Sequence, residues 1–319
     1  DLEKDCTLMD EYEDSATEQE PQGPVSAGPY CRALKDAEKA FQTYQDKVTS
    51  IEKLYASLKT MSEAVGDREF QIFWANLEVL KPTIYTRPPQ PVVQPRQRGG
   101  KNMLLPKELG RAAAEILERA LEYDVEADDL HDTLIQVRDD LAIGARGVPW
   151  VLDNGQCIHV DREDFLHEPA RKWSEVGWVA RRAYLTKDEI KKRFPSVDVV
   201  KVKFDKLKSE DDGIGNDYAT TGKKAQVWEM WHKAEGKVCW VMHGYPDVLD
   251  EQPPLIEVKG FFPCPRPAYG TLERRTLKPV PDFVYYRDQV DEINELTARI
   301  SALSESLRLK GFYASGTSE

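Results

Sequence analysis

The chain has 319 residues, a hydrophobic fraction of 40% and a formal net charge of −12 at pH 7. That length suffices for two domains, and the acidic balance excludes a general binder of the DNA phosphate backbone, which needs clustered Lys and Arg. No apolar run approaches the about 20 residues that span a bilayer, and no basic-then-apolar leader opens the chain, so we expect no membrane contact.

The N-terminal half is predicted to be helical. Residues 1–29 are acidic and polar, and we interpret them as a solvated arm, with docking on a partner as the alternative. After the arm, apolar residues recur at spacings of three and four, which is typical of amphipathic helices. The predicted helices cover residues 30–58, 67–80, 106–123 and 125–143.

Prolines interrupt these predicted helices, and one histidine lies in the last of them. Pro82 is expected to end the second helix at Lys81, because the proline ring disfavours helical geometry in the preceding residue. The Pro-rich segment 83–98 predicts a rigid extended crossing, and an SH3-type ligand is the alternative. His131, among acidic neighbours without a second His or Cys, is interpreted as part of a solvated face.

The period changes at Gly147, where β-structure is predicted to begin. A hairpin is expected around the turn 153–156, and a second joins 225–231 to 237–243. Further strands are predicted at 173–184 and 255–262, with loops at 161–168 and 201–224. Thr186 and Glu189 have the spacing of a capping box at the start of a short helix.

The C-terminal part is dominated by a helix predicted within residues 281–311. Glu295 lies four residues before Arg299, the favourable order for a charge pair on a helix surface. Apolar residues form a single stripe, so the helix either docks on its own domain or packs against copies of itself. The stripe consists of Val290, Ile293, Leu296, Ile300, Leu303 and Leu307.

These elements predict an α+β fold: a helical N-terminal half, antiparallel β hairpins in the middle and one long helix near the C-terminus. No phosphate-binding loop, dinucleotide fingerprint or nucleophile elbow is present. The five cysteines are scattered and lack a CxxC spacing, which argues against a zinc site or a disulfide framework. We therefore expect no catalytic residues, no cofactor and no metal. A hydrolase assembled from dispersed His and acidic residues is the enzymatic alternative.

Several stretches, taken in order, resemble the portal proteins of tailed bacteriophages. The first is REFQIFWANLEVLKPTIYTRPPQPVV at 68–93, and WVARRAYLTKDEIKKRFP at 178–195 is similar to the wing region of that family. AQVWEMWHKAEGKVCWVMHGY at 225–245 resembles a hairpin of the family. The most specific stretches are GFFPCPRPAYGT at 260–271 and LKPVPDFVYYRDQVDEINELTARISAL at 277–303.

The resemblance implies a subunit of a closed ring, usually of twelve copies, at one vertex of the capsid. Such a ring conducts double-stranded DNA during packaging and ejection, and it contacts the large terminase, the major capsid and scaffolding proteins and the head-to-tail adaptor. It implies location in the virion, with assembly in the host bacterial cytoplasm. Residues 30–280 would be the wing, 281–311 the first stem helix and 312–319 the start of the clip.

In that family the chain continues through a clip, a second stem helix and a tunnel loop, so the DNA-contacting residues would lie beyond Glu319. An acidic conduit would let DNA slide, because it avoids strong phosphate contacts. Charged residues of the stem are candidates for the lumen or for pairing between subunits. They are Asp288, Asp291, Glu292, Glu295, Arg299 and Arg308. The alternative is a cellular coiled-coil scaffold without a DNA role.

Overall fold

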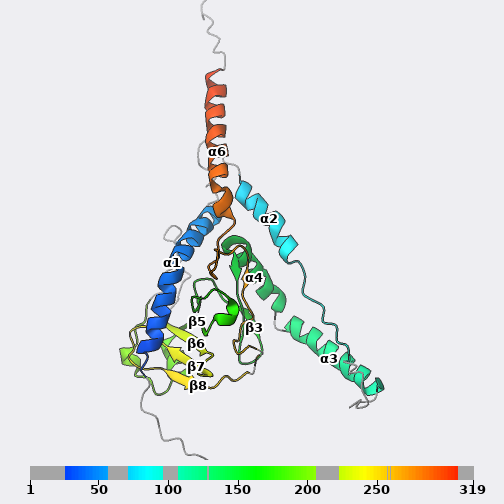
Figure 1. Ribbon diagram of the computed structural model, residues 1–319, viewed down its shortest axis with the longest axis vertical. Coiled ribbons are helices and arrows are strands. Elements are labelled where there is room, and N and C mark those ends of the chain that lie inside the picture. The colour runs from blue at the N-terminus through cyan, green and yellow to red at the C-terminus, as the bar shows by residue number, and fades with distance from the viewer. Residues whose placement is uncertain are drawn as a thin grey trace, which may run out of the picture.

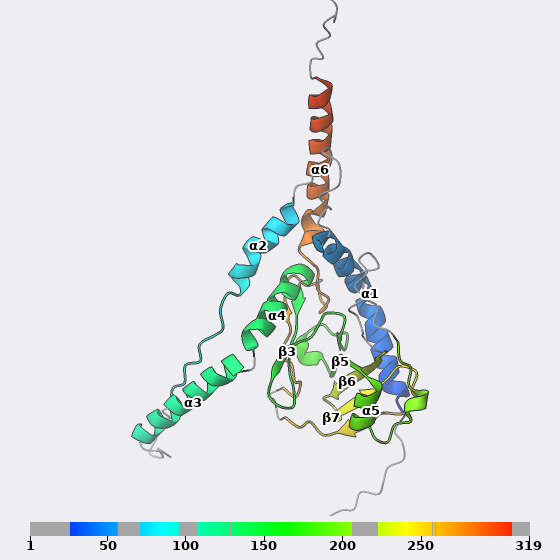
Figure 2. The same cartoon turned by 180° about the vertical axis from the view of Figure 1, so that it is seen from behind.

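A computed structural model describes residues 26–56, 71–95, 107–127, 129–205, 223–256, 258 and 260–307. The fold is α+β, as predicted: helices form most of the N-terminal half, antiparallel sheets the middle, and one long helix lies near the C-terminus. Both views in Figures 1 and 2 show a body from which the C-terminal helix α6 (Phe283–Ser306) projects at one end, while helix α3 (Lys107–Ala127) extends to one side. Most of the predicted arm, residues 1–25, lies outside the described residues.

The body is built on a five-stranded antiparallel sheet. Its order is β4 (Phe165–His167), β5 (Trp178–Leu185), β6 (Ala225–His232), β7 (Lys237–Val241) and β8 (Asp250–Gln252). Strands β5 and β6 pair along their full length, from Trp178 opposite His232 to Leu185 opposite Ala225. The predicted hairpin around 153–156 is confirmed, with β2 (Pro149–Val151) paired to β3 (Cys157–His159). A small ladder joins β1 (Arg146–Gly147) to β9 (Ala268–Tyr269).

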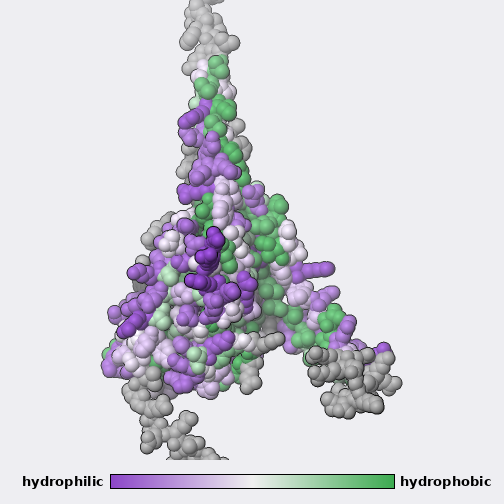
Figure 3. Space-filling view, in the orientation of Figure 1, coloured by the Kyte–Doolittle hydropathy of each residue, from purple (hydrophilic) through white to green (hydrophobic). Residues whose placement is uncertain are grey.

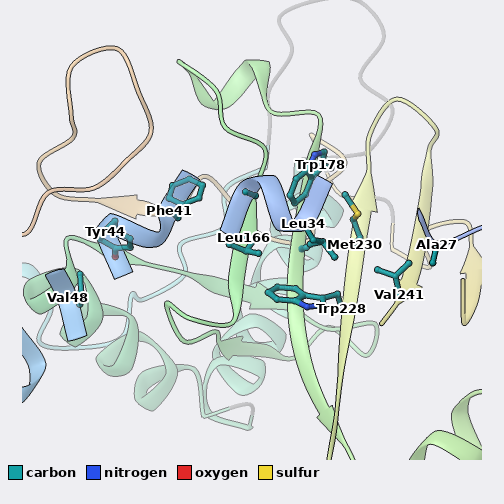
Figure 4. Packing of buried hydrophobic residues seen from close by; sticks show 12 residues of the cluster. Ala27, Leu34, Phe41, Tyr44, Val48, Leu166, Trp178, Trp228, Met230 and Val241 are labelled. Carbon is teal, nitrogen blue, oxygen red and sulfur yellow. The ribbon is translucent and has the colours of Figure 1, made fainter. Parts of the chain in front are cut away.

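Helix α1 (Gly28–Ala56) covers one face of this sheet. Its buried stripe includes Leu34, which lies among Trp178, Trp228 and Met230 of the central strands, and Phe41, which belongs to the same cluster further along the helix (Figure 4). Alternation along the strands places every second residue toward α1, since successive strand side chains point to opposite faces. Each of these large side chains contributes about 1.5–3 kcal/mol by leaving water.

The opposite face of the sheet has its own core. Trp150, Phe165, Val179 and Trp231 pack there together with the segment around Phe262. The short helices η1 (Trp173–Glu175) and η2 (Val199–Lys201) lie in the connections.

Helix α5 (Lys187–Arg193) closes a third cluster at one edge, through Ile190. Thr186 and Glu189 form the capping box that the sequence predicted at its N-terminus. That cap satisfies otherwise unpaired backbone donors of the first turn.

The helix predicted over 67–80 is displaced in the structure, where α2 covers Ile72–Ile84 and residues 67–70 lie outside the described part. The prediction that Pro82 ends this helix at Lys81 is wrong, because Pro82 lies inside α2. Pro82 falls in the last turn, where its missing N–H costs a single intrahelical bond, to the carbonyl of Glu78. The Lys81 ammonium is held by Glu78 and the Tyr55 hydroxyl, each at 2.8 Å, which fixes the turn before the proline.

The boundary between the next two predicted helices also differs. Helix α3 covers Lys107–Ala127 and α4 begins only at Leu130, so residues 124–127 continue α3 and do not start a new helix. The break occurs at Asp129, which has a positive φ of 49° and directs the chain into α4. Helix α4 (Leu130–Gly144) ends one residue beyond the predicted end at 143, and Ala145 follows in a left-handed conformation.

Three predictions in the β region are wrong. The strand predicted at 173–184 begins only at Trp178, because Trp173–Glu175 form η1. Residues 161–168 were expected to be loop, yet Phe165–His167 form β4, whose three side chains are all buried. The strand predicted at 255–262 is absent from its described residues, and the fifth strand of the sheet is Asp250–Gln252 instead. Phe261 has a φ of 78°, which is incompatible with a strand. Of the predicted loop 201–224, residues 206–222 lie outside the described part.

Helix α6 covers Phe283–Ser306, within the predicted range 281–311. Residues 308–319, which include the predicted start of the clip, lie outside the described residues. Among the helices of the described part, none combines the length and the apolarity needed to cross a membrane.

Candidate assembly interface on the C-terminal helix

Helix α6 is anchored to the body by its first turns. The ring centroid of buried Phe283 lies 4.4 Å from that of Phe73 in α2, and Val290, two turns further on, is also buried. The Thr271 hydroxyl donates a hydrogen bond of 2.9 Å to the Asp282 carboxylate just before the helix. Burial raises the pKa of Tyr286, which packs against the same cluster. The base of α6 therefore shares a core with α1, α2 and α4.

Beyond Val290 the predicted stripe is exposed. The exposed fractions are 42% for Ile293, 46% for Leu296, 65% for Ile300, 63% for Leu303 and 80% for Leu307. Exposure thus rises toward the tip, where α6 stands clear of the body in both views (Figures 1 and 2). Contiguous exposed apolar surface of this kind marks an interaction site in soluble proteins.

The charged residues of α6 occupy a different side of the helix from the stripe. All of the predicted acidic residues are exposed: Asp288, Asp291, Glu292 and Glu295. Arg299 forms an ion pair with Glu295, and Arg287 lies 3.6 Å from the Asp291 carboxylate, both four residues apart. The predicted Glu295–Arg299 pair is thus confirmed within one chain. Arg308 lies outside the described residues.

The apolar surface continues from α6 over neighbouring helices. Trp74, Val79 and Leu80 of α2 are exposed, and Ile116 and Tyr123 of α3 are exposed by 70% and 71%. Figure 3 shows hydrophobic surface along α6 and over the side of the body that carries α2 and α3. Sequence periodicity found these helices, but it does not distinguish a face that packs on the body from one that remains open.

The histidines, in contrast, do not form a common site, because each contacts different partners. His159 lies 2.7 Å from Asp140, His243 lies 3.3 Å from Glu38, and His232 lies 3.8 Å from Glu235. The expectation that His131 lies on a solvated face is wrong, since its ring is half-buried and its Nδ1 lies 3.1 Å from the Tyr85 hydroxyl. Within the described ranges, His, Cys, Asp and Glu side chains form no cluster of three that could hold a metal ion.

Sequence reasoning missed a buried polar group at the centre of the body. Arg146 is 1% exposed, and its guanidinium carbon lies 5.1 Å from the ring centroid of Tyr44 and 5.3 Å from that of Phe165. Its Nη2 donates to the carbonyl of Arg162 at 2.8 Å. Aromatic faces stabilise a cation through their quadrupole, most strongly away from water. Arg146 follows the last turn of α4, where the sequence offers no sign of burial.

His167 lies beside this arginine and is also fully buried. Its Nδ1–H donates to the carbonyl of Glu168 at 2.8 Å, because a carbonyl only accepts, and its Nε2 accepts from the Tyr269 hydroxyl at 3.2 Å. Burial, with the Arg146 cation as the second cause, lowers the pKa of His167 to about 3. Its ring lies 4.8 Å from that of Phe41, centroid to centroid, so the neutral imidazole serves as a core residue.

Comparison with known proteins adds no relative. No protein-family model matches the chain, and no curated protein matches it significantly.

Proposed function

We propose that this chain is a subunit of a portal ring at a single vertex of a bacteriophage capsid. The ring would conduct double-stranded DNA and provide the docking platform for the large terminase and the head-to-tail adaptor. Major capsid and scaffolding proteins would surround it during assembly in the host cytoplasm, and it would remain in the virion.

One observation carries the proposal: the apolar stripe of α6 is anchored to its own body only at its base. An isolated helix is marginal in water, because most helical stability in proteins comes from packing an amphipathic face. A partner that covers Ile293 to Leu307 would supply that packing. Neighbouring copies supply it in a ring, where each helix contacts one on either side.

Two further features support a ring over a smaller assembly. The exposed apolar surface extends from the stripe of α6 over α2 and α3, so more than one helix face of each copy requires cover (Figure 3). A heterologous contact buries different surfaces on the two sides of a copy, and its repetition gives a ring where the rotation between copies closes and an open filament where it does not. The exposed acidic side chains of α6 suit a conduit through which DNA slides without binding.

The mass of the assembly tests the proposal. A ring of twelve copies of this 36.4 kDa chain has a mass of about 440 kDa. Native mass spectrometry and end-on electron-microscope images of the purified protein should show one closed species near that mass. A protein that stays monomeric at high concentration would overturn the proposal.

The free amphipathic α6 also favours a second candidate, a coiled-coil scaffold without a DNA role. A coiled coil would pair the stripes of two or three copies in a parallel or antiparallel bundle. The same mass measurement separates the two candidates, because the coiled coil predicts a dimer or trimer and the portal predicts a large ring.

A further inference from the structure

Helix α5 lies at the end of the body that is remote from α6 (Figure 2), and it carries a concentrated basic surface together with neighbouring residues. We call it the α5 basic surface; its exposed members are Lys187, Lys191, Lys192, Arg193, Lys201, Lys203 and Lys223. Residues 187–205 and 223–224 contain eight basic and four acidic side chains, in a chain whose net charge is −12. One of the four acids, Glu189, is already engaged in the cap of α5. Two of the cations have carboxylate partners, since Arg193 lies 3.6 Å from Asp250 and Lys201 lies 3.8 Å from Asp198, but the surface is still locally positive on an acidic protein.

The fold holds this surface rigidly. Ile190 and Phe194 are buried in the third cluster together with Met242 and Leu249, so the basic side chains on the other faces of α5 point outward. The backbone N–H of Asp198 donates to the Tyr245 hydroxyl at 3.4 Å. The connection between β7 and β8 thus lies directly against α5 and η2.

The first described residues of the chain attach to that same connection. The N–H of Ala27 donates to the carbonyl of Pro246 at 2.9 Å, and Ser26 pairs with Asp247 in an isolated bridge. Residues 1–25 therefore join the fold beside the α5 basic surface. They contain nine acidic residues and one lysine, which is eight of the twelve net negative charges of the chain.

We propose that the α5 basic surface is the docking site of the acidic segment 1–25 of the same chain. Charge complementarity identifies the occupant, and the attachment at Ser26 makes the encounter intramolecular, at an effective concentration on the order of millimolar. A segment of 25 residues spans up to about 80 Å when extended, so reach does not limit the contact. The contact forms within one chain and does not depend on ring assembly.

Duplex DNA is the competing occupant, and the net charge of the whole protein disfavours it. Free DNA must also displace the acidic segment, which is part of the same chain and attached near the site. In the proposed arrangement the segment occupies the lysines and keeps phosphate backbones from binding there.

Zero-length carbodiimide cross-linking of the full chain tests the proposal. At low salt, peptide mapping should join carboxylates of residues 1–25 to lysines of the α5 basic surface. The yield should fall steeply toward 1 M salt, where the screening length is about 3 Å. The variant Lys191→Glu/Lys192→Glu should lower the yield at the remaining lysines about tenfold, since it introduces repulsion at the centre of the surface.

The matched control is Lys47→Glu/Lys53→Glu, which reverses two exposed lysines near the far end of α1 and should leave the cross-links unchanged. Mixing isotope-labelled and unlabelled chains should give cross-links within one chain. Cross-links between labelled and unlabelled copies, equal loss in both variants, or displacement of the segment by a duplex DNA at equimolar concentration would each overturn the proposal.

Discussion

Truncation of the stripe at the tip of α6 separates an assembly interface from an ordinary helix surface. The variant Ile300→Ala/Leu303→Ala removes two aliphatic side chains that are 65% and 63% exposed in the single chain. Because both are largely in water and alanine favours helices, the free energy of unfolding of the body should change by less than about 0.5 kcal/mol. If a neighbouring helix covers these side chains, each truncation costs about 2 kcal/mol at that contact.

The combined cost of about 4 kcal/mol corresponds to a roughly thousandfold weaker contact between neighbouring copies. Mass photometry over a concentration series should therefore show the wild-type ring dissociating at much lower concentration than the variant. Thermal unfolding of the body provides the internal check.

The control Val200→Ala/Leu255→Ala also truncates two exposed aliphatic residues, but far from α6. It should assemble like the wild type. A stripe variant that assembles as tightly as the control would refute the assignment of this face to an interface.

Three predictions concern the body itself. Phe41→Ala should lower the free energy of unfolding by about 3–5 kcal/mol, because Phe41 is 1% exposed in the main core. Glu52→Gln should cost about 2 kcal/mol, since it removes the carboxylate that accepts two hydrogen bonds from the buried Arg162 guanidinium and leaves only Glu163, at 3.3 Å; the figure is below that of a fully buried pair because Glu52 is 37% exposed. His167 has a pKa lowered to about 3 in the fold, so below about pH 6.5 the unfolded chain binds a proton that the folded chain does not. Stability should fall by up to about 1.4 kcal/mol per pH unit from this group as pH falls toward 4, and His167→Gln should remove that part of the slope.

Chemical denaturation measured at several pH values checks all three. Wild type and His167→Gln should have parallel curves above pH 7.5, and equal slopes between pH 4 and 6 would contradict the buried neutral histidine. For the ion pair, Glu52→Leu/Arg162→Met should recover most of the loss, because it removes the buried charge together with its partner. Phe41→Leu, which keeps most of the volume, should cost clearly less than Phe41→Ala.

The sequence correctly predicted the elements that depend on short-range residue patterns. The stripe of α1, the hairpin β6–β7 and the capping box of α5 each depend on residues a few positions apart, and all three are present. The wrong predictions share a different cause. Strand β4 has three residues, and it is a strand because Leu166 packs under α1 while Phe165 packs on the opposite side of the sheet. No local pattern carries that information.

Contacts between distant segments also determine which polar residues are buried in the core. Nothing local in the sequence marks Arg146, Arg162 and His167 as core residues, since charged side chains are rarely buried without partners. Their partners come from segments far apart in the chain: Glu52 for Arg162, Tyr269 for His167 and the ring of Phe41 for Arg146. Spacing along the sequence does not encode such contacts.

The candidate interface also shows what sequence periodicity does not determine. The sequence located the stripe of α6 to the residue, yet its period is the same whether the face meets its own body or another copy. The structure separates the two alternatives along a single helix. Val290 is 8% exposed and belongs to the shared cluster at the base, while Leu307, five turns further on, is 80% exposed. One stripe therefore has two environments, and the part beyond Val290 is the part that a second copy can cover. A body with four clusters of its own does not need that cover, so loss of the ring should leave each body folded.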